Sequence, residues 1–190
     1  RSDAAQHEVL AAPGNAGIGR DAALVDVDMM SPSSVTAYAK SHGVDLVVVG
    51  PEAPLVAGVA DALREHGIPV FGPGKRAAQL EGSKAFAKRI MENADVPTGR
   101  AVHARTLDDT AAALDEFGAP YVVKADGLAA GKGVIVTEDR AAALEHASAF
   151  LPSGPVLVEE FLSGPEVSLF FLSDGDTVRA LSPAQDFKRA

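Results

Sequence analysis

Short apolar runs alternate with amphipathic stretches of helical length over residues 8–80. This alternation is typical of βα units, in which the strands form a parallel sheet and the helices cover it. The Val47–Val49 run is continuously apolar, which favours a central strand covered on both faces. The predicted strands are Glu8–Ala12, Leu24–Asp28, Asp45–Val49 and Pro69–Phe71.

Capping signals predict the helices between these strands. Ser31 and Pro32 have the residue types of an N-cap and a first helical residue, and Gly43 is a stop signal. A second helix is expected to start at Pro54 and to end at Gly67. Helices and strands therefore alternate through this region, as a parallel sheet requires.

A different pattern begins near residue 100. A helix at 83–93, capped by Ser83 and ended before Pro97, separates the two patterns. The later elements predict a compact α+β module followed by a hairpin that turns at residues 173–176. These elements are a strand from about Arg100, helix Thr106–Phe117, strands Pro120–Lys124 and Val134–Thr137, helix Glu138–Phe150, strand Val156–Glu160 and hairpin Glu166–Ala180.

Composition limits the possible functions. The 190 residues are 47% hydrophobic, enough for one sizeable core and a smaller one, and they include no cysteine. No apolar run approaches the roughly 20 residues that cross a bilayer, so we expect no membrane association and a cytoplasmic location. A net charge of −9 argues against nucleic-acid binding. Because cations are few, lysines beside glycine-rich turns become informative: Lys84, Lys124 and Lys132.

The loop between the runs 122–125 and 134–136 is the main candidate for phosphate chemistry. Its glycines and alanines let backbone N–H groups approach an anion, and Lys124 and Lys132 add positive charge. A P-loop is excluded because Lys132 precedes Gly133 and a strand, whereas that motif needs Ser or Thr and then a helix. Two interpretations remain: a β-loop-β flap that covers a triphosphate, or a flexible hairpin with incidental lysines.

Other candidate ligand groups lie after strands. The 156–162 segment runs from an apolar strand into a polar turn, which suits recognition of an adenine edge by backbone groups, with a carboxylate beyond it for ribose hydroxyls. Ligands in open α/β sheets bind at the carboxyl ends of strands, which here carry Gly14-Asn15 and Gly50-Pro51-Glu52. Glu52 also suits the first turn of a helix, where the dipole favours a carboxylate.

Three stretches together resemble one family. They are Gly50–Gly58, Phe71–Lys88 and Lys124–Gly133, flanked by Pro13–Gly17 and Ala184–Arg189, and they are similar to the phosphoribosylamine–glycine ligases of the ATP-grasp class. The resemblance implies an α/β fold: a Rossmann-like pre-ATP-grasp domain with a parallel sheet, then an incomplete ATP-grasp domain with an α+β flap subdomain. The implied divisions are 1–80, 81–101, 102–168 and 169–190, the last being the start of the second ATP-grasp lobe.

The resemblance also implies an activity. The family joins glycine to 5-phosphoribosylamine, with conversion of ATP to ADP and phosphate, through glycyl phosphate in purine biosynthesis. Glycine and 5-phosphoribosylamine are then the expected partners, and a monomer is expected. The implied ATP-binding residues are Lys84, Lys124, Gly127, Gly131, Lys132, Gly133, Glu159, Phe161, Leu162 and Glu166. The implied phosphoribosylamine-binding residues are Gly14, Asn15, Gly50, Pro51 and Glu52, and Asp186, Lys188 and Arg189 would border the reaction centre.

Departures from the family pattern affect activity. The family begins with a strand and a Gly-Gly-Arg-Glu-His turn before the position of Arg1, and it continues past Arg189 to the ligands of Mg²⁺ or Mn²⁺. On this reading the chain is incomplete at both ends, and we expect that these 190 residues alone do not form product. The alternatives are another ATP-grasp ligase or carboxylase, such as biotin carboxylase, and a non-catalytic ATP-binding module.

Overall fold

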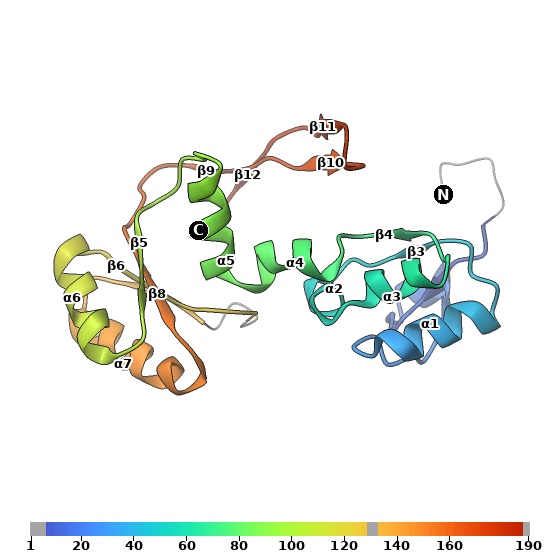
Figure 1. The fold of residues 1–190 in the computed structure, drawn as a ribbon, viewed down its shortest axis with the longest axis horizontal. Coiled ribbons are helices and arrows are strands. Elements are labelled where there is room, and N and C mark those ends of the chain that lie inside the picture. The colour runs from blue at the N-terminus through green and yellow to red at the C-terminus, as the bar shows by residue number, and fades with distance from the viewer. Residues whose placement is uncertain (1–6, 129–132, 188–190) are drawn as a thin grey trace.

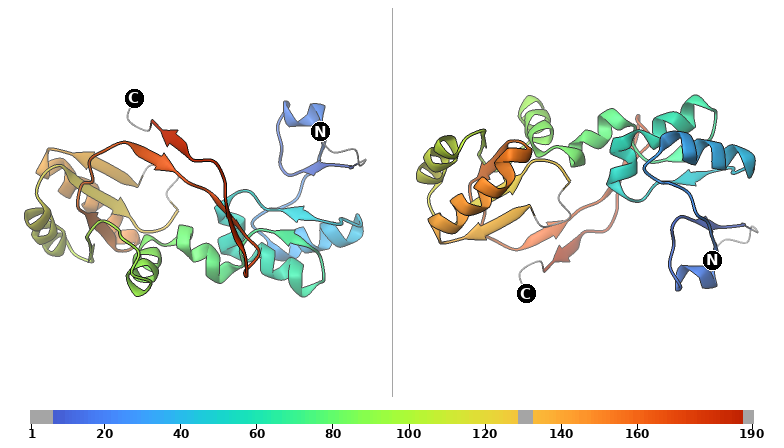
Figure 2. Two further views of the ribbon diagram at one scale, coloured as in Figure 1. Left: turned by 90° about the horizontal axis from the view of Figure 1, so that it is seen from above. Right: turned by 90° about the horizontal axis from the view of Figure 1, so that it is seen from below.

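The computed structural model describes residues 7–128 and 133–187. Figure 1 shows an elongated molecule with an N-terminal unit at one end and a larger β-sheet at the other. Helices α4 (Lys75–Gly82) and α5 (Lys84–Asn93) join the two ends. The C-terminal strands leave the sheet and extend back toward the N-terminal unit, as both views in Figure 2 show.

The N-terminal unit contains two separate two-stranded parallel ladders, β1–β2 and β3–β4. Each of the four predicted strands overlaps an observed strand, but each observed strand has only two residues. The expectation of a central strand covered on both faces is wrong, because the Val48 side chain is 65% exposed. The strands are β1 (Leu10–Ala11), β2 (Ala23–Leu24), β3 (Val47–Val48) and β4 (Val70–Phe71).

The helices of this unit follow their capping residues. Helix α1 (Pro32–Ser41) starts as predicted, since the Ser31 side chain accepts a hydrogen bond from the Ser34 N–H. The predicted 54–67 helix is two helices, α2 (Glu52–Ala57) and α3 (Val59–Glu65). They are divided at Gly58, which has a left-handed φ of 100°. A short 3₁₀ helix, η1 (Ile18–Arg20), lies between β1 and β2.

The core of the N-terminal unit lies between α1, α3 and the β3–β4 ladder. Ala39 of α1 packs with Val59 and Leu63 of α3 and with Ile68 before β4. Leu63 has no exposed surface. Burial of apolar surface of this kind is the main favourable term in folding, so this contact holds the small ladder on its helices.

The second unit is a four-stranded antiparallel sheet with the order β5-β8-β6-β7. Its predicted elements are confirmed. A capping box at Thr106 and Asp109 starts α6, and Asp139 accepts from the first turn of α7. The bounds are β5 (Ala101–Ala104), α6 (Leu107–Phe117), β6 (Tyr121–Ala125), β7 (Val134–Thr137), α7 (Arg140–Phe150), the 3₁₀ helix η2 (Leu151–Ser153) and β8 (Val156–Glu159).

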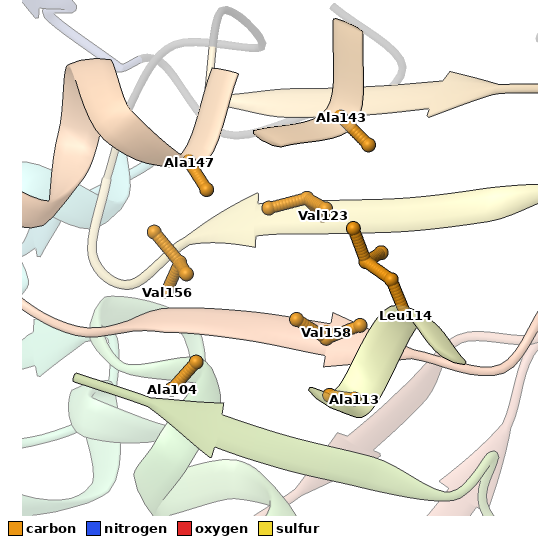
Figure 3. Close-up of a cluster of buried hydrophobic side chains, with 8 residues drawn as sticks. All are labelled: Ala104, Ala113, Leu114, Val123, Ala143, Ala147, Val156 and Val158. Atoms are coloured by element: carbon orange, nitrogen blue, oxygen red, sulfur yellow. The ribbon is translucent and has the colours of Figure 1, made fainter. Parts of the chain in front are cut away.

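Helices α6 and α7 cover one face of this sheet. Figure 3 shows Leu114 of α6 and Ala147 of α7 directed at the strands, where Val123, Val156 and Val158 meet them. These five side chains are completely buried. Alternate residues of the same strands face the other way, because side chains alternate across a sheet. That opposite face carries the candidate site.

The C-terminal segment forms two further ladders. β9 (Glu166–Ser168) pairs with β12 (Ala184–Asp186), and β10 (Phe171–Ser173) pairs with β11 (Val178–Ala180). The predicted turn at 173–176 is therefore confirmed, although the 166–168 segment pairs with a later strand. None of the helices among the described residues is long and apolar enough to span a membrane.

Candidate functional site

The sheet face opposite α6 and α7 presents Lys124 of β6 beside Leu157 and Glu159 of β8. Lys124 lies opposite Leu157 in the ladder, and Glu159 lies two residues further along β8, so all three share this face. The centre of the face is shielded from solvent, since Leu157 is completely buried. Val134, at the β7 edge of the face, is 41% exposed. Polar groups here therefore lie next to apolar surface and remain open toward one edge.

Helix α5 supplies two more ammonium groups to this region. The Ser83 side chain accepts from the Phe86 N–H and starts the helix as predicted. Lys84 and Lys88 are one helical turn apart, so they lie on the same side of α5. Lys88 is 8% exposed, which is unusual for a lysine and indicates that its charge is paired.

Asp126 attaches the end of β6 to the start of α5. Its carboxylate accepts from the backbone N–H of Lys84 at 2.7 Å and of Ala85 at 3.3 Å, and from the Ser83 hydroxyl at 3.1 Å. The Lys84 ammonium donates to the Gly127 carbonyl at 2.9 Å. A carboxylate at a helix N-terminus is favoured by the free N–H groups and by the helix dipole. The loop after β6 is thus held against Lys84.

Glu159 lies between two lysines. One of its carboxylate oxygens accepts from the Lys88 ammonium at 3.2 Å, and the other contacts the Lys124 ammonium. Lys88 also donates to the Thr98 hydroxyl at 2.8 Å and to the Gly99 carbonyl at 2.6 Å. One carboxylate between two ammonium groups leaves a local net charge of +1, which suits an anionic ligand even in a chain with a net charge of −9.

The predicted β-loop-β arrangement is confirmed at its ends. β6 and β7 are antiparallel neighbours, and the Ala125 N–H donates to the Gly133 carbonyl at 2.6 Å, which closes the base of the loop. Gly127 has a left-handed φ of 96°, which glycine adopts without strain. Gly131 and Lys132 lie outside the described residues.

The segment predicted to hold adenine and ribose follows β8. Leu162 is 65% exposed, and Glu166 on β9 lies directly opposite Asp186 on β12. The structure thus brings a predicted ribose ligand next to a predicted reaction-centre residue. Lys188 and Arg189, predicted to lie beside Asp186, are outside the described residues.

Glu160, next to the paired Glu159, has a structural partner. The Arg100 backbone N–H and guanidinium donate to its two oxygens at 2.9 and 3.0 Å. The backbone hydrogen bond, followed by the guanidinium bond, lowers the pKa of Glu160 below its ordinary value. Glu160 therefore stays ionised and joins the start of β5 to the end of β8.

The turns predicted to bind phosphoribosylamine lie in the N-terminal unit. The Asn15 side chain accepts from the Gly17 and Ile18 N–H groups at 2.9 and 3.0 Å, so it holds the turn that leads into η1. Gly50 and Pro51 precede α2, and Glu52 is its first residue. Among residues 7–128 and 133–187, no hydrogen bond or ion pair connects these turns to the lysines of the sheet face.

Sequence reasoning missed two residues of the site, Asp126 and Lys88. Asp126 follows a strand and precedes a glycine, a position equally typical of an ordinary turn. Lys88 had a usable signal, because it lies four residues after Lys84 on a predicted helix and so shares its face. The pairing of Lys88 with Glu159 is a tertiary contact, which no spacing along the chain predicts.

The described residues do not fit a metal site. Across 7–128 and 133–187, no group of three or more histidine, cysteine, aspartate or glutamate side chains could hold a metal ion. The candidate site has a different chemistry, since two lysine ammonium groups and a small-residue turn suit phosphate oxygens. We therefore assign no metal ligand to these residues.

Comparison with known proteins gives the family. Family models described as the phosphoribosylglycinamide synthetase N domain and ATP-grasp (A) domain match residues 1–81 and 82–190. The phosphoribosylamine–glycine ligase of Leifsonia xyli is 69% identical over 189 residues, a match that covers 99% of this chain and 45% of that protein. The chain thus spans under half the length of this relative.

Solved structures agree with this result. The crystal structure of phosphoribosylamine–glycine ligase from Thermotoga maritima has 32% identity and a TM-score of 0.73, over 93% of this chain and 44% of that one. The N5-carboxyaminoimidazole ribonucleotide synthetase of Thermus thermophilus has 21% identity and a TM-score of 0.67, over 88% and 44% of the two chains, and shows the shared fold alone. The α/β fold with a partial ATP-grasp domain is thereby confirmed, and the chain belongs to the phosphoribosylglycinamide synthetase family.

Proposed function

We propose that this chain provides the ATP-binding front part of a ligase that joins glycine to 5-phosphoribosylamine. The products would be glycinamide ribonucleotide, ADP and phosphate, formed through glycyl phosphate. Family membership supports this reaction. The observation that carries the proposal is that two ammonium groups lie near the end of β6, because Lys84 donates to the Gly127 carbonyl just after this strand and Lys124, on the strand, contacts Glu159.

Each residue has a role in this proposal. Lys84 and Lys124 neutralise phosphate oxygens, and the backbone of Gly127 and Gly133 lets the chain approach them closely. Phosphorylation of the glycine carboxylate gives it a good leaving group, and the phosphoryl group comes from ATP. The buried centre of the sheet face strengthens the attraction between ammonium groups and phosphate, because the local dielectric constant is low.

The other proposed contacts are those to adenine, to ribose, to the reaction centre and to phosphoribosylamine. Backbone groups at Glu159, Phe161 and Leu162 would contact adenine, and Glu166 would accept from the ribose hydroxyls. Asp186, the cross-strand neighbour of Glu166, would border the reaction centre, as family membership implies. The turns at 14–15 and 50–52 would hold phosphoribosylamine.

Calorimetric titration of the chain with a non-hydrolysable ATP analogue tests the nucleotide site. Wild type is expected to bind, and Lys124→Ala is expected to bind at least about tenfold more weakly, because hydrogen bonds to charged groups contribute roughly 1.5–3 kcal/mol. Lys40→Ala removes the same charge from an exposed position on α1 and should bind like wild type. Wild-type binding no tighter than that of Lys124→Ala would refute the proposed phosphate site.

A second candidate function is nucleotide binding without turnover. The contacts of Lys84 and Lys124 favour it, since they support phosphate binding and do not by themselves require a reaction. Release of ADP that depends on both glycine and phosphoribosylamine separates the two candidates, because a binding module releases none. Replacing phosphoribosylamine with bicarbonate in the same assay tests the carboxylase alternative.

A further inference from the structure

The Lys124 ammonium has two competing partners, the Glu159 carboxylate and a nucleotide phosphate. Within the described residues, its ammonium pairs with the Glu159 carboxylate, whose side chain is 12% exposed. A nucleotide phosphate that recruits Lys124 must draw it away from this carboxylate. A carboxylate in a nearly dry site without a cation is strongly disfavoured, so Glu159 alone would hold Lys124 and oppose nucleotide binding.

Lys88 removes this conflict. Its side chain is 10% exposed and pairs with the second oxygen of Glu159 at 3.2 Å. Bonds to the Thr98 hydroxyl and the Gly99 carbonyl occupy the rest of its ammonium group, so Lys88 is fixed in place. Lys124, by contrast, is 29% exposed and can turn toward the open edge of the face.

We propose that Lys88 is a positioning residue that keeps Glu159 charge-compensated, so that the Lys124 ammonium can pass from Glu159 to a nucleotide phosphate. Lys88 itself does not touch the nucleotide. The inference rests on the proposed function for its ligand, but the exchange of partners follows from the Lys88–Glu159–Lys124 contacts. The inference thus gives Lys88, a buried lysine on α5, an indirect role in nucleotide binding that its position on the helix alone does not predict.

The test is a cycle of variants titrated with a non-hydrolysable ATP analogue. Lys88→Met should bind the analogue roughly tenfold more weakly than wild type, because without Lys88 the Glu159 carboxylate holds the Lys124 ammonium. Adding Glu159→Gln to Lys88→Met should restore binding to within about threefold of wild type, because the amide no longer holds Lys124. The matched control is Arg89→Met, which removes a neighbouring exposed charge on α5 and should leave binding unchanged.

A purely structural role for Lys88 has a different outcome. If Lys88 only fastens α5 to residues 98–99, Lys88→Met loses binding and the double variant does not recover it, which overturns the proposal. Equal binding by Lys88→Met and wild type overturns it as well. If Lys88→Met does not fold, Lys88→Gln replaces it, since glutamine can still donate to Thr98 and Gly99 without the charge.

A measurement without nucleotide separates this inference from the proposed function. Reductive methylation, read by peptide mass spectrometry, reports how firmly the Lys124 amine is held. Labelling of Lys124 should be slower in Lys88→Met than in wild type, and faster again in the double variant. That order of rates with no nucleotide binding by wild type would overturn the proposed function and leave only the compensation of Glu159 by Lys88, whereas equal rates in all three proteins would overturn the inference itself.

Discussion

At the residue scale, the site depends on a carboxylate that joins two distant parts of the chain. Asp126 at the end of β6 accepts from Ser83, Lys84 and Ala85, which are more than 40 residues away along the chain. It therefore acts as a helix cap supplied from another element. Two predicted phosphate-binding residues, Lys84 and Lys124, have their relative positions set by this contact.

Replacing Asp126 with alanine should destabilise the chain. The substitution leaves N–H groups of the first turn of α5 without a partner, and loss of a cap costs about 1–2 kcal/mol of unfolding free energy. Urea denaturation measures this change. Asp45→Ala, at an exposed position, is the control and should change the unfolding free energy by less than about 0.5 kcal/mol. Equal effects for the two variants would show that Asp126 does not cap α5.

Glu160 predicts a dependence of stability on pH. Its pKa in the folded chain lies below the ordinary value of 4.5, first because of the Arg100 backbone N–H and then because of the Arg100 side chain. A lowered folded-state pKa gives stability that is fully present above pH 4.5 and is lost as the pH falls through the folded-state pKa.

Glu160→Gln is therefore expected to be less stable than wild type at neutral pH, with a difference that shrinks in acid. The amide keeps the shape of the side chain but cannot ionise. Thermal unfolding of both proteins between neutral pH and about pH 3 measures the difference, over the range in which carboxylates titrate. A gap that stays constant or widens in acid contradicts the prediction.

The residues of the candidate phosphate site could be identified in part from the sequence. The lysines beside the small-residue loop stood out because the chain has only 17 lysines and arginines. Asp126 and Lys88 did not stand out, because their roles come from contacts between α5 and the sheet. Residue type and local spacing report the chemistry that is available, whereas the pairing of charges depends on tertiary packing.

At the element scale, helix starts were predicted better than helix continuity. Ser31 and Ser83 cap helices as expected, because a side-chain oxygen that accepts from the first turn is a local signal. Thr106, predicted as the first residue of its helix, is instead the N-cap of α6. Helix α4 (Lys75–Gly82) was missed, since Gly74 before it offers no side-chain cap. The break at Gly58 was also missed, because an isolated glycine is tolerated in a helix.

The break at Gly58 is open to a direct test. With φ at 100°, an added Cβ would disfavour the left-handed backbone, and Gly58→Ala should cost about 1–2 kcal/mol of unfolding free energy. The nearest atom to that Cβ would be Lys75 Cδ at 3.5 Å, an ordinary contact, so the cost is conformational and not a clash. The measurement is again urea denaturation.

Gly50→Ala is the matched control for this substitution. Gly50 is exposed, its φ is outside the left-handed region, and a Cβ there would meet nothing within 4 Å. Its unfolding free energy should match that of wild type to within about 0.5 kcal/mol. If Gly58→Ala is as stable as this control, α2 and α3 can fuse into the single helix that the sequence pattern favours.

At the scale of the whole molecule, the two ends differ in how their strands are supported. β6 and β8 lie inside a four-stranded sheet whose covered face has completely buried side chains. β10 and β11 form an isolated two-stranded ladder, in which Phe171 is 56% and Val178 is 59% exposed. The turn at 173–176 predicted the hairpin, but the sequence did not predict the order of strands in the larger sheet, because that order depends on distant partners.

This difference predicts unequal protection of backbone amides in hydrogen exchange. A two-stranded hairpin without a packed face is marginally stable, whereas core strands open only with much of the unit. Amides of β6 and β8 should therefore exchange at least about 100-fold more slowly than those of β10 and β11, as followed by mass spectrometry. Equal protection would mean that the exposed Phe171 and Val178 are covered in solution. Repeating the exchange at several protein concentrations would then show what covers these side chains. A second copy of the chain protects the hairpin only at high concentration, whereas a contact within one chain protects it at every concentration.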